Sequence, residues 1–393
     1  MNFNTFQNKK VLNNAKSAGW RLYPLTDLLI DDSRNSLKIK KRDYIEVGDT
    51  PIIDQGKELI GGYSDVEDGF YKEKSYIVFG DHTRILKYID FPAFIGADGV
   101  KILKNINEEV AITKYLYYFL STISIPDTGY NRHFKFLKEV IIPVPKIDVQ
   151  IEIVNLLDKT MNVIDKRQQQ IEALSALKQS VFLDMFGDPN SSDNKYPKER
   201  IGNLIEVQTG KTPSRKNLNY WNNGDVPWIK TTEVKNKRIE SSSEFVTEEA
   251  VNESKLKLFP INTIFIAMYG QGKTRGQSAL LTFPATCNQA CAALLPNESM
   301  DELFLWNQLL LQYESLRSLG RGGNQPNLNL SLVRDFEILT PPLSLQQEYS
   351  NSIKRVDKII EEIKNSYLYL EQLYDSLIHK SFNGELFKED IKV

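Results

Sequence analysis

The strongest constraint on the fold is a long internal repeat. When the sequence is shifted by 196 positions, the segment that ends at Phe186 aligns without a gap with the segment that ends at Phe382, over more than forty residues. The identical pairs include Pro145/Pro341, Gln150/Gln346, Glu152/Glu348, Asn155/Asn351, Ile164/Ile360, Leu174/Leu370, Leu177/Leu373, Ser180/Ser376 and Phe186/Phe382. A repeat of this length indicates that the chain contains two copies of one structural unit.

Each copy predicts a long helix. A strand-like run and a proline come first, and Asp148 and Ser344 then stand where a helix N-cap is expected. Apolar residues follow at spacings that alternate between 3 and 4, which is the pattern of a coiled-coil seam. A helix from about Leu345 to Phe382 would be about 57 Å long, at about 1.5 Å per residue. So long an apolar seam needs another long helix to cover it, and the other copy is the obvious partner.

The two seams differ in polarity. In the second copy the seam consists of Ile353, Val356, Ile360, Ile363, Tyr367, Leu370, Tyr374 and Leu377. In the first copy, the equivalent residues are Leu157, Thr160, Ile164, Arg167, Ile171, Leu174, Lys178 and Val181, of which three are polar. We expect the apolar members to form the interface of the helix pair.

A globular segment precedes each helix, and the two segments open alike, with LYPLTDLL and KERIGNLI. Each then has a strand-like run that ends in a polar glycine loop, YIVFGDHTR and TIFIAMYGQGKTRG. We therefore predict an α+β fold of two similar mixed α/β domains and two long helices, related by a pseudo-two-fold repeat. The expected boundaries are an N-terminal extension at 1–19, a first domain at 20–144, a first helix at 145–187, a linker at 188–197, a second domain at 198–340, a second helix at 341–385 and a tail at 386–393.

The composition indicates a soluble globular chain, with 41% hydrophobic and 25% charged residues. The two cysteines, Cys287 and Cys291, favour a reducing compartment. No apolar run approaches the roughly 20 residues of a membrane helix, and the N-terminus has no hydrophobic core like that of a signal peptide. The expected location is the cytoplasm, without a membrane partner.

The distribution of charge differs from its sum. The net charge of −2 argues mildly against nucleic-acid binding. However, residues 34–42 contain five basic residues and no acid, and residues 200–239 contain eight basic residues and three acids. Such patches can attract a polyanion even when the total charge is near zero. Solvated loops and helix faces are the alternative interpretation.

No motif predicts catalysis or a metal site. The stretch AMYGQGKT at 267–274 fits a relaxed P-loop pattern, but the RGQSALLTFP that follows predicts a turn into a strand, whereas a P-loop leads into a helix. Cys287 and Cys291 are better explained as buried thiols, because the three histidines are scattered and zinc needs about four ligands. We find no nuclease-type acid-x-Lys pair, no base-methylation motif and no loop suited to S-adenosylmethionine. The chain is therefore expected to be non-catalytic and to bind no metal.

Polar loops with basic, amide and aromatic side chains are the features that suit nucleic acid. Residues 209–234 interleave lysine and arginine with tyrosine and tryptophan, and residues 320–329 add arginine, asparagine and glutamine. Lysine and arginine neutralise phosphates, whereas arginine, asparagine and glutamine can read base edges. The candidate DNA-binding residues are Arg34, Lys38, Lys40, Lys41, His82, Arg84, Lys211, Thr212, Arg215, Lys216, Trp228, Lys230, Thr231, Gln271, Lys273, Arg275, Arg321, Asn324 and Gln325. Ordinary polar loops are the alternative.

Four segments together resemble the specificity subunits of type I restriction–modification systems. They are PKIDVQIEI…SVFLDMFGDP, PPLSLQQEY…YDSLIHKSFNGEL, TGKTPSRKNLNYWNNGDVPWIKTTEV and GRGGNQPNLNLSLVRDFEILTPP. The resemblance extends over nearly the whole chain from Trp20. It is weakest in the first domain, which lacks the TGKTPS and GNQPN loops. It implies that each domain is a target recognition domain that reads one half of a split site in double-stranded DNA.

The resemblance also implies partners. The two helices would form an antiparallel coiled coil that spaces the domains and docks two methyltransferase subunits, and motor-endonuclease subunits would join the complex. The expected helix-pair and partner interface is Leu157, Ile164, Ile171, Leu174, Val181, Ile353, Val356, Ile360, Ile363, Tyr367, Leu370 and Leu377. S-adenosylmethionine, ATP and magnesium would belong to the partner subunits, with no cofactor on this chain. The alternatives are a stand-alone DNA-binding scaffold or regulator with the same repeat, and a carbohydrate- or nucleotide-binding enzyme.

Overall fold

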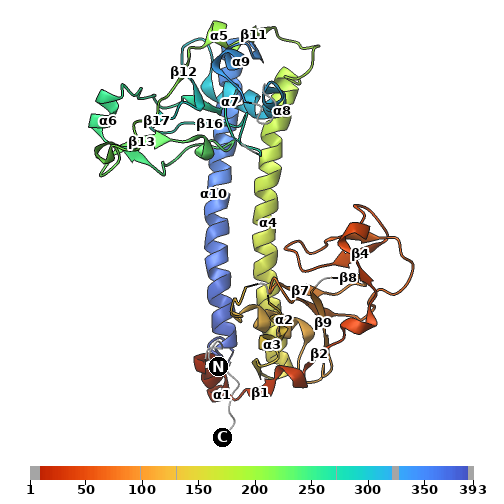
Figure 1. Cartoon of the computed structure of the whole chain (residues 1–393). Helices are drawn as coiled ribbons and strands as arrows, with labels where there is room; N and C mark the ends of the chain where they lie inside the picture. The colour runs from red at the N-terminus through yellow and green to blue at the C-terminus, as the bar shows by residue number, and fades with distance from the viewer. Residues whose placement is uncertain (1–8, 98, 130, 271, 321–326, 388–393) are drawn as a thin grey trace. The chain divides into compact units, whose positions relative to one another are not determined.

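The computed structural model describes residues 9–97, 99–129, 131–270, 272–320 and 327–387 (Figure 1). The chain divides into two compact units. The first unit comprises residues 1–168 and 365–393, and the second comprises residues 169–364. Among the described residues, no helix is both long enough and apolar enough to cross a bilayer.

The first unit is built around two small sheets. Its elements are α1 (Lys9–Ser17), β1 (Arg21–Pro24), β2 (Leu29–Asp31), β3 (Lys38–Ile39), β4 (Thr50–Ile53), β5 (Gly62–Ser64), β6 (Tyr76–Gly80), β7 (Leu86–Ile89), β8 (Phe94–Gly96), β9 (Val100–Asn105), α2 (Thr113–Ser121), α3 (Phe134–Leu137), β10 (Ile141–Val144), the start of α4 (Ile147–Phe186) and the end of α10 (Leu343–Phe382). The sheet orders are β2-β9-β6-β7 and β3-β8-β4-β5, and β1 pairs separately with β10.

The second unit repeats this plan. Its elements are the end of α4, β11 (Lys198–Arg200), α5 (Ile201–Leu204), β12 (Val207–Thr209), β13 (Val226–Ile229), β14 (Phe245–Val246), α6 (Glu248–Glu253), β15 (Ile264–Ala267), β16 (Ser278–Leu280), β17 (Thr286–Cys287), β18 (Cys291–Leu294), α7 (Glu302–Leu311), α8 (Tyr313–Ser318), α9 (Leu330–Arg334), β19 (Glu337–Leu339) and the start of α10 (Leu343–Phe382). The sheet orders are β12-β18-β15-β16 and β14-β13-β17, and β11 pairs with β19. The predicted two-copy α+β architecture is confirmed.

The two long helices run antiparallel within each unit. In the first unit, Ile153 near the start of α4 shares a core with Phe382 at the end of α10. In the second unit, Phe182 near the end of α4 packs on Tyr349 near the start of α10, with 5.5 Å between ring centroids. Both helices are 40 residues long, so each contributes one end to either core. The expected boundaries at 145 and 341 divide each domain from the helix that follows it. In the structure, each compact unit instead contains one domain together with parts of both long helices.

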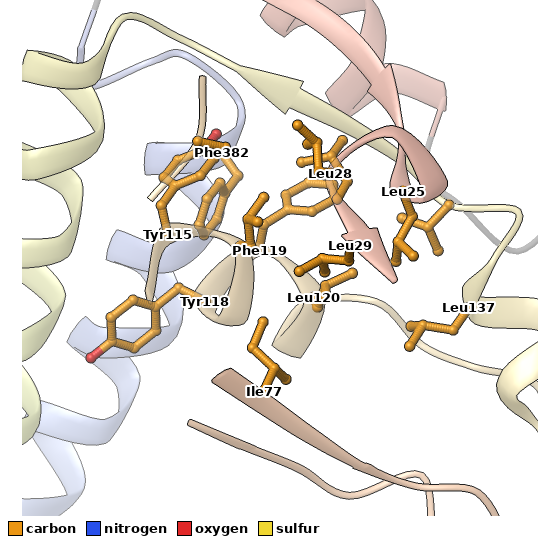
Figure 2. Packing of buried hydrophobic residues seen from close by; sticks show 14 of the residues in the cluster. Leu25, Leu28, Leu29, Ile77, Tyr115, Tyr118, Phe119, Leu120, Leu137 and Phe382 are labelled. Carbon is orange, nitrogen blue, oxygen red and sulfur yellow. The ribbon is translucent and has the colours of Figure 1, made fainter. Parts of the chain in front are cut away.

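The cores are apolar and rich in aromatic rings. In the first unit, Phe382 packs between Tyr115 and Phe119 of α2, with ring centroids 5.4 Å away in each case (Figure 2). Leu28, Leu29 and the other leucines of Figure 2 complete this core. Such burial of large apolar side chains is the main source of stability in a unit of this size.

The helix starts differ slightly from the expectation. Asp148 and Ser344 are the second residues of α4 and α10, so neither is the N-cap. A repeated glutamine instead ties each helix start to its unit. Gln150 donates to the carbonyl oxygens of Pro145 and Val110, each at 2.8 Å, and its side-chain oxygen accepts from the Ile112 amide at 2.8 Å. Gln346 donates to Pro341 at 2.8 Å and accepts from the Asp301 amide at 2.9 Å.

None of the apolar seam residues predicted for the two helices is exposed to solvent. Leu157, Ile164, Ile353 and Ile360 are buried, whereas Ile171, Leu174, Val181, Val356, Ile363, Tyr367, Leu370 and Leu377 are half-buried. Their role in binding a partner subunit stays a prediction.

Candidate nucleic-acid interface

The loop at 210–217 in the second unit is fixed at its base. A Cβ atom on Gly210 would lie 1.8 Å from the carbonyl oxygen of Cys287 in β17, so only glycine fits there. At the next residue, the indole nitrogen of Trp228 donates to the carbonyl oxygen of Lys211 at 3.0 Å. These contacts leave the side chains of Lys211, Thr212 and Lys216 exposed. The loop therefore presents two lysines and a hydroxyl from a rigid base.

Trp228 itself is a core residue. Its side chain is 2% exposed and packs with Val246, Ala250 and Leu256. The prediction that Trp228 contacts DNA is therefore wrong, because the ring is already enclosed and its only donor is used within the unit. The aromatic residue in GDVPWI supports the loop from below.

Arg215 and Lys230 share one carboxylate. The Arg215 guanidinium carbon lies 3.6 Å from the Trp221 ring centroid and 4.8 Å from that of Trp228. Arg215 and Lys230 bind the two oxygens of Glu244 at 2.5 Å and 2.6 Å. Burial raises the pKa of Glu244, but the hydrogen bonds from Lys230 and Arg215 outweigh it, so the pKa is lowered overall. Both cations are thus held in place, and because they share a single carboxylate the group keeps one net positive charge.

The loop at 268–276 is held by α8. The Tyr313 hydroxyl donates to the Lys273 carbonyl oxygen at 2.6 Å, and Arg317 donates to the Arg275 carbonyl at 3.0 Å and to that of Gly272. The Lys273 side chain is exposed, whereas Arg275 is half-buried. Strand β16 follows this loop, as predicted. The loop is therefore not a nucleotide-binding P-loop, which would lead into a helix.

The turn at 288–290, between β17 and β18, brings the predicted loops together. The Thr212 hydroxyl donates to the side-chain oxygen of Gln289 at 2.5 Å, and the Met268 amide donates to the Ala290 carbonyl at 2.8 Å. The Leu328 amide in turn donates to the Met268 carbonyl at 2.9 Å. Sequence reasoning missed the exposed Gln289, although the amide pair in TCNQACAALL interrupts an apolar run. Thr231 is half-buried in the segment after β13.

In the first unit, the basic run is exposed but irregular. Arg34 lies in a 3₁₀ turn (Ser33–Asn35), Lys38 begins β3, and Lys40 and Lys41 lie at the start of a second turn (Lys41–Asp43). The side chains of all four residues are exposed. They remain candidates for phosphate contact.

Strand β4 of the first unit is the counterpart of β13. The stretch GDTPII at 48–53 matches GDVPWI at 224–229, and β4 pairs in parallel with β8 as β13 pairs with β17. The segment at 54–61 therefore corresponds to the segment after β13. It wraps around the buried Lys87, whose ammonium donates to the carbonyl oxygens of Asp54 at 2.8 Å and Glu58 at 2.5 Å. Burial lowers the pKa of Lys87, and Asp54 partly opposes the shift.

The first unit thereby gains candidates that sequence reasoning missed. A Cβ atom on Gly99 would lie 2.5 Å from His82 and 3.1 Å from the side-chain oxygen of Gln55, so these two side chains lie side by side. Lys57 in the same loop is exposed. Arg84 instead bonds to the Asp127 carboxylate at 2.8 Å, which fixes the turn between β6 and β7. The repeated GDxPxI stretch was the signal for this loop.

Four predicted residues, Gln271, Arg321, Asn324 and Gln325, lie outside the described part of the chain. Within the described part, no group of three His, Cys, Asp or Glu side chains is placed to hold a metal ion. Cys287 and Cys291 are free and buried, and contact with Cys287, together with burial, raises the pKa of the Cys291 thiol. The buried-thiol interpretation of the pair is confirmed.

Comparison with known proteins identifies relatives for both units. The profile of the type I restriction modification DNA specificity domain matches residues 18–175 and 194–372. The EcoR124I/EcoR124II specificity subunit of Escherichia coli is 24% identical over 355 residues, which cover 86% of this chain and 87% of that protein. The MjaIX specificity subunit of Methanocaldococcus jannaschii is 29% identical over 206 residues, which cover 50% of this chain and 47% of that protein.

Two solved structures share the fold. The S subunit of a type I restriction–modification system from M. genitalium has a TM-score of 0.59 and 17% identity, and the match covers 92% of this chain and 96% of that one. A chain from a structural study of the assembly of a type I restriction–modification system has a TM-score of 0.56 and 13% identity, and the match covers 93% and 98% of the two chains. At this identity, the likeness concerns the fold alone.

Proposed function

Because the chain belongs to the type I restriction–modification DNA specificity family, we propose that each of its two units reads one half of a bipartite site in double-stranded DNA. The chain is a DNA-recognition subunit and carries no catalytic site of its own. The observation that best supports bipartite reading is that both units contain the same parallel strand pair, β4 with β8 in the first unit and β13 with β17 in the second. In each unit, loops with amide and basic side chains lie beside this pair. Different loops on one scaffold suit two different half-sites.

The two units have unlike recognition chemistry. The second unit offers Lys211, Lys216 and Lys273 for phosphates and Gln289 for a base edge. The first unit offers Gln55 and His82, side by side, together with Lys57 and the basic run at 34–41. Arg215 and Lys230 support their loop through Glu244 and, because they share that one carboxylate, leave one net positive charge beside it.

The remaining functions belong to other subunits. We propose that the chain binds two methyltransferase subunits along its helices and that motor-endonuclease subunits join them. These subunits would bind S-adenosylmethionine, ATP and magnesium. We also propose that the complex acts on DNA in the cytoplasm.

The test is to express the chain with the methyltransferase subunit of its host and to sequence the methylated DNA. We expect one bipartite motif. Replacing residues 198–340 by the matching segment of a relative should change one half of that motif and leave the other. If both halves change together, or if no motif is methylated while the partner is active and bound, the assignment of one half-site to each unit fails.

A further inference from the structure

The two units differ at one place beside the helix pair. The amides of Ile112 and Asp301 make the same bond to Gln150 and Gln346, which aligns α2 with α7. Tyr118 of α2 is then the counterpart of Asn307 of α7. The repeat of 196 residues likewise makes Tyr374 of α10 the counterpart of Lys178 of α4.

In the first unit, the rings of Tyr118 and Tyr374 occupy this place. Tyr118 is 5% exposed, and its hydroxyl donates to the Asp158 carboxylate at 2.5 Å. The Tyr117 ring lies against it, with 5.3 Å between centroids. Tyr374 is half-buried against the same core, where burial raises its pKa to about 12.

In the second unit, the same place is a pocket of about 150 Å³ that is partly open to solvent. Its lining is Ser175, Lys178, Gln179, Phe182, Asn307, Leu310, Leu311 and Tyr349. Asn307 turns back to the Leu303 carbonyl at 2.7 Å, and Lys178 turns to the Asp357 carboxylate at 2.7 Å. Neither side chain replaces the ring that its counterpart supplies.

One residue of the pocket lining, Tyr349, carries a buried hydroxyl. The Tyr349 hydroxyl is buried and has no hydrogen-bond partner among the described residues. A buried hydroxyl is normally paired. A ligand that carries an aromatic ring would fill the space that the two missing tyrosine rings leave.

We propose that this pocket binds the side chain of a tyrosine presented by a partner protein. The other copy of the fold fills the same place with tyrosine, and a volume of about 150 Å³ is enough for a single aromatic ring. A protein is favoured over a free small molecule because the group that fills the counterpart place is itself a protein side chain, and the exposed Leu183 lies one turn beyond Gln179 on α4. This proposal rests on the proposed function only because it requires a protein partner. It also means that the surfaces by which the two units bind their partners differ.

The first measurement is the binding of p-cresol, the small molecule that corresponds to the tyrosine side chain, to the full-length chain. Saturation-transfer NMR should show binding to the wild type. Asn307→Tyr restores the ring of the first unit, so binding should be lost while cooperative thermal unfolding is kept. Tyr118→Asn opens the matching place in the first unit, and a folded variant should bind p-cresol at a second site. Absence of binding to the wild type, or equal binding to Asn307→Tyr, would overturn the pocket.

The second measurement separates the possible ligands and the proposed function. Asn307→Tyr should weaken the binding of one partner subunit about tenfold or more, as expected for loss of an aromatic anchor, and leave DNA affinity unchanged. If p-cresol binds but the partner's affinity for the variant equals that for the wild type, the pocket serves a free aromatic molecule and the docking proposal is wrong. A failure of DNA recognition would leave the p-cresol result untouched.

Discussion

Exposed lysines and ion-paired cations in the second unit should contribute differently to DNA binding. Lys273 stands on a loop held by Tyr313 and Arg317, so its ammonium can meet a phosphate with little loss of loop entropy. We predict that Lys273→Ala weakens binding to all sequences and lowers the salt slope by about 1. Fluorescence anisotropy at several salt concentrations measures both effects. Lys354→Ala, an exposed lysine on α10, is the matched control, and an equal loss in both variants would remove the assignment.

Gln289 should act on specificity instead. An amide that reads a base edge contributes about 1–3 kcal/mol of discrimination against the wrong base. We predict that Gln289→Ala relaxes one position of the half-site and leaves the salt slope unchanged. Sequencing of methylated sites in cells gives the preference at every position. A uniform loss at all positions would mean that Gln289 only supports Thr212.

The Glu244 carboxylate gives the second unit a pH-dependent contribution to stability. Its pKa is lowered in the folded state, so the stabilisation is complete above the ordinary pKa of glutamate, about 4.3, and is lost as pH falls through the lowered value. Because the group is partly exposed, we expect Glu244→Gln to cost only about 1 kcal/mol or less at pH 7. Urea unfolding should show the stabilities of the two proteins converging as the pH falls below the ordinary glutamate pKa and through the lowered one. A gap that does not narrow in acid would point to packing rather than charge.

At the scale of elements, the repeat predicts the two helices well because their spacing pattern is local. The N-cap prediction fails at Asp148 because the buried Gln150 fixes the helix start through contacts with Val110 and Ile112, just before α2, which are distant in sequence. Trp228 is misassigned for a related reason. A tryptophan among lysines is typical of a nucleic-acid loop, and only the parallel pairing of β13 with β17 shows that it points inward. The loop after β4 could be located from the sequence, because GDTPII matches GDVPWI. The residues that lie beside Gln55 could not, because their positions depend on how the whole sheet is paired.

The repeated glutamine should therefore matter more than its polarity suggests. Gln150→Ala removes three hydrogen bonds and leaves buried backbone groups unpaired. We predict a loss of about 1–3 kcal/mol in the free energy of unfolding, measured by urea titration. Gln347→Ala changes an exposed glutamine on α10 and should cost little. Similar losses for the two variants would show that the anchoring hydrogen bonds of Gln150 are not responsible, because alanine itself favours the helix.

For the whole molecule, the two 40-residue helices are the elements shared by both cores. Phe186 and Phe382 occupy equivalent positions in the repeat, yet Phe186 belongs to the core of the second unit and Phe382 to that of the first. A change of helix length should therefore alter the separation of the two half-sites without changing the loops that read them. A straight helix of this length extends about 60 Å, at about 1.5 Å per residue.

We predict that helix length sets the DNA spacer. Inserting four residues after Gln169 and four after Asn365, its equivalent in the repeat, lengthens each helix by about 6 Å and turns the seam by only about 40°. With base pairs about 3.4 Å apart, the preferred spacer should grow by one or two base pairs while both half-sites stay the same, because no recognition loop is touched. Sequencing of methylated DNA from cells that carry the variant measures both properties. A parental spacer, or altered half-sites, would mean that the units find their spacing through the partner subunits rather than through these helices.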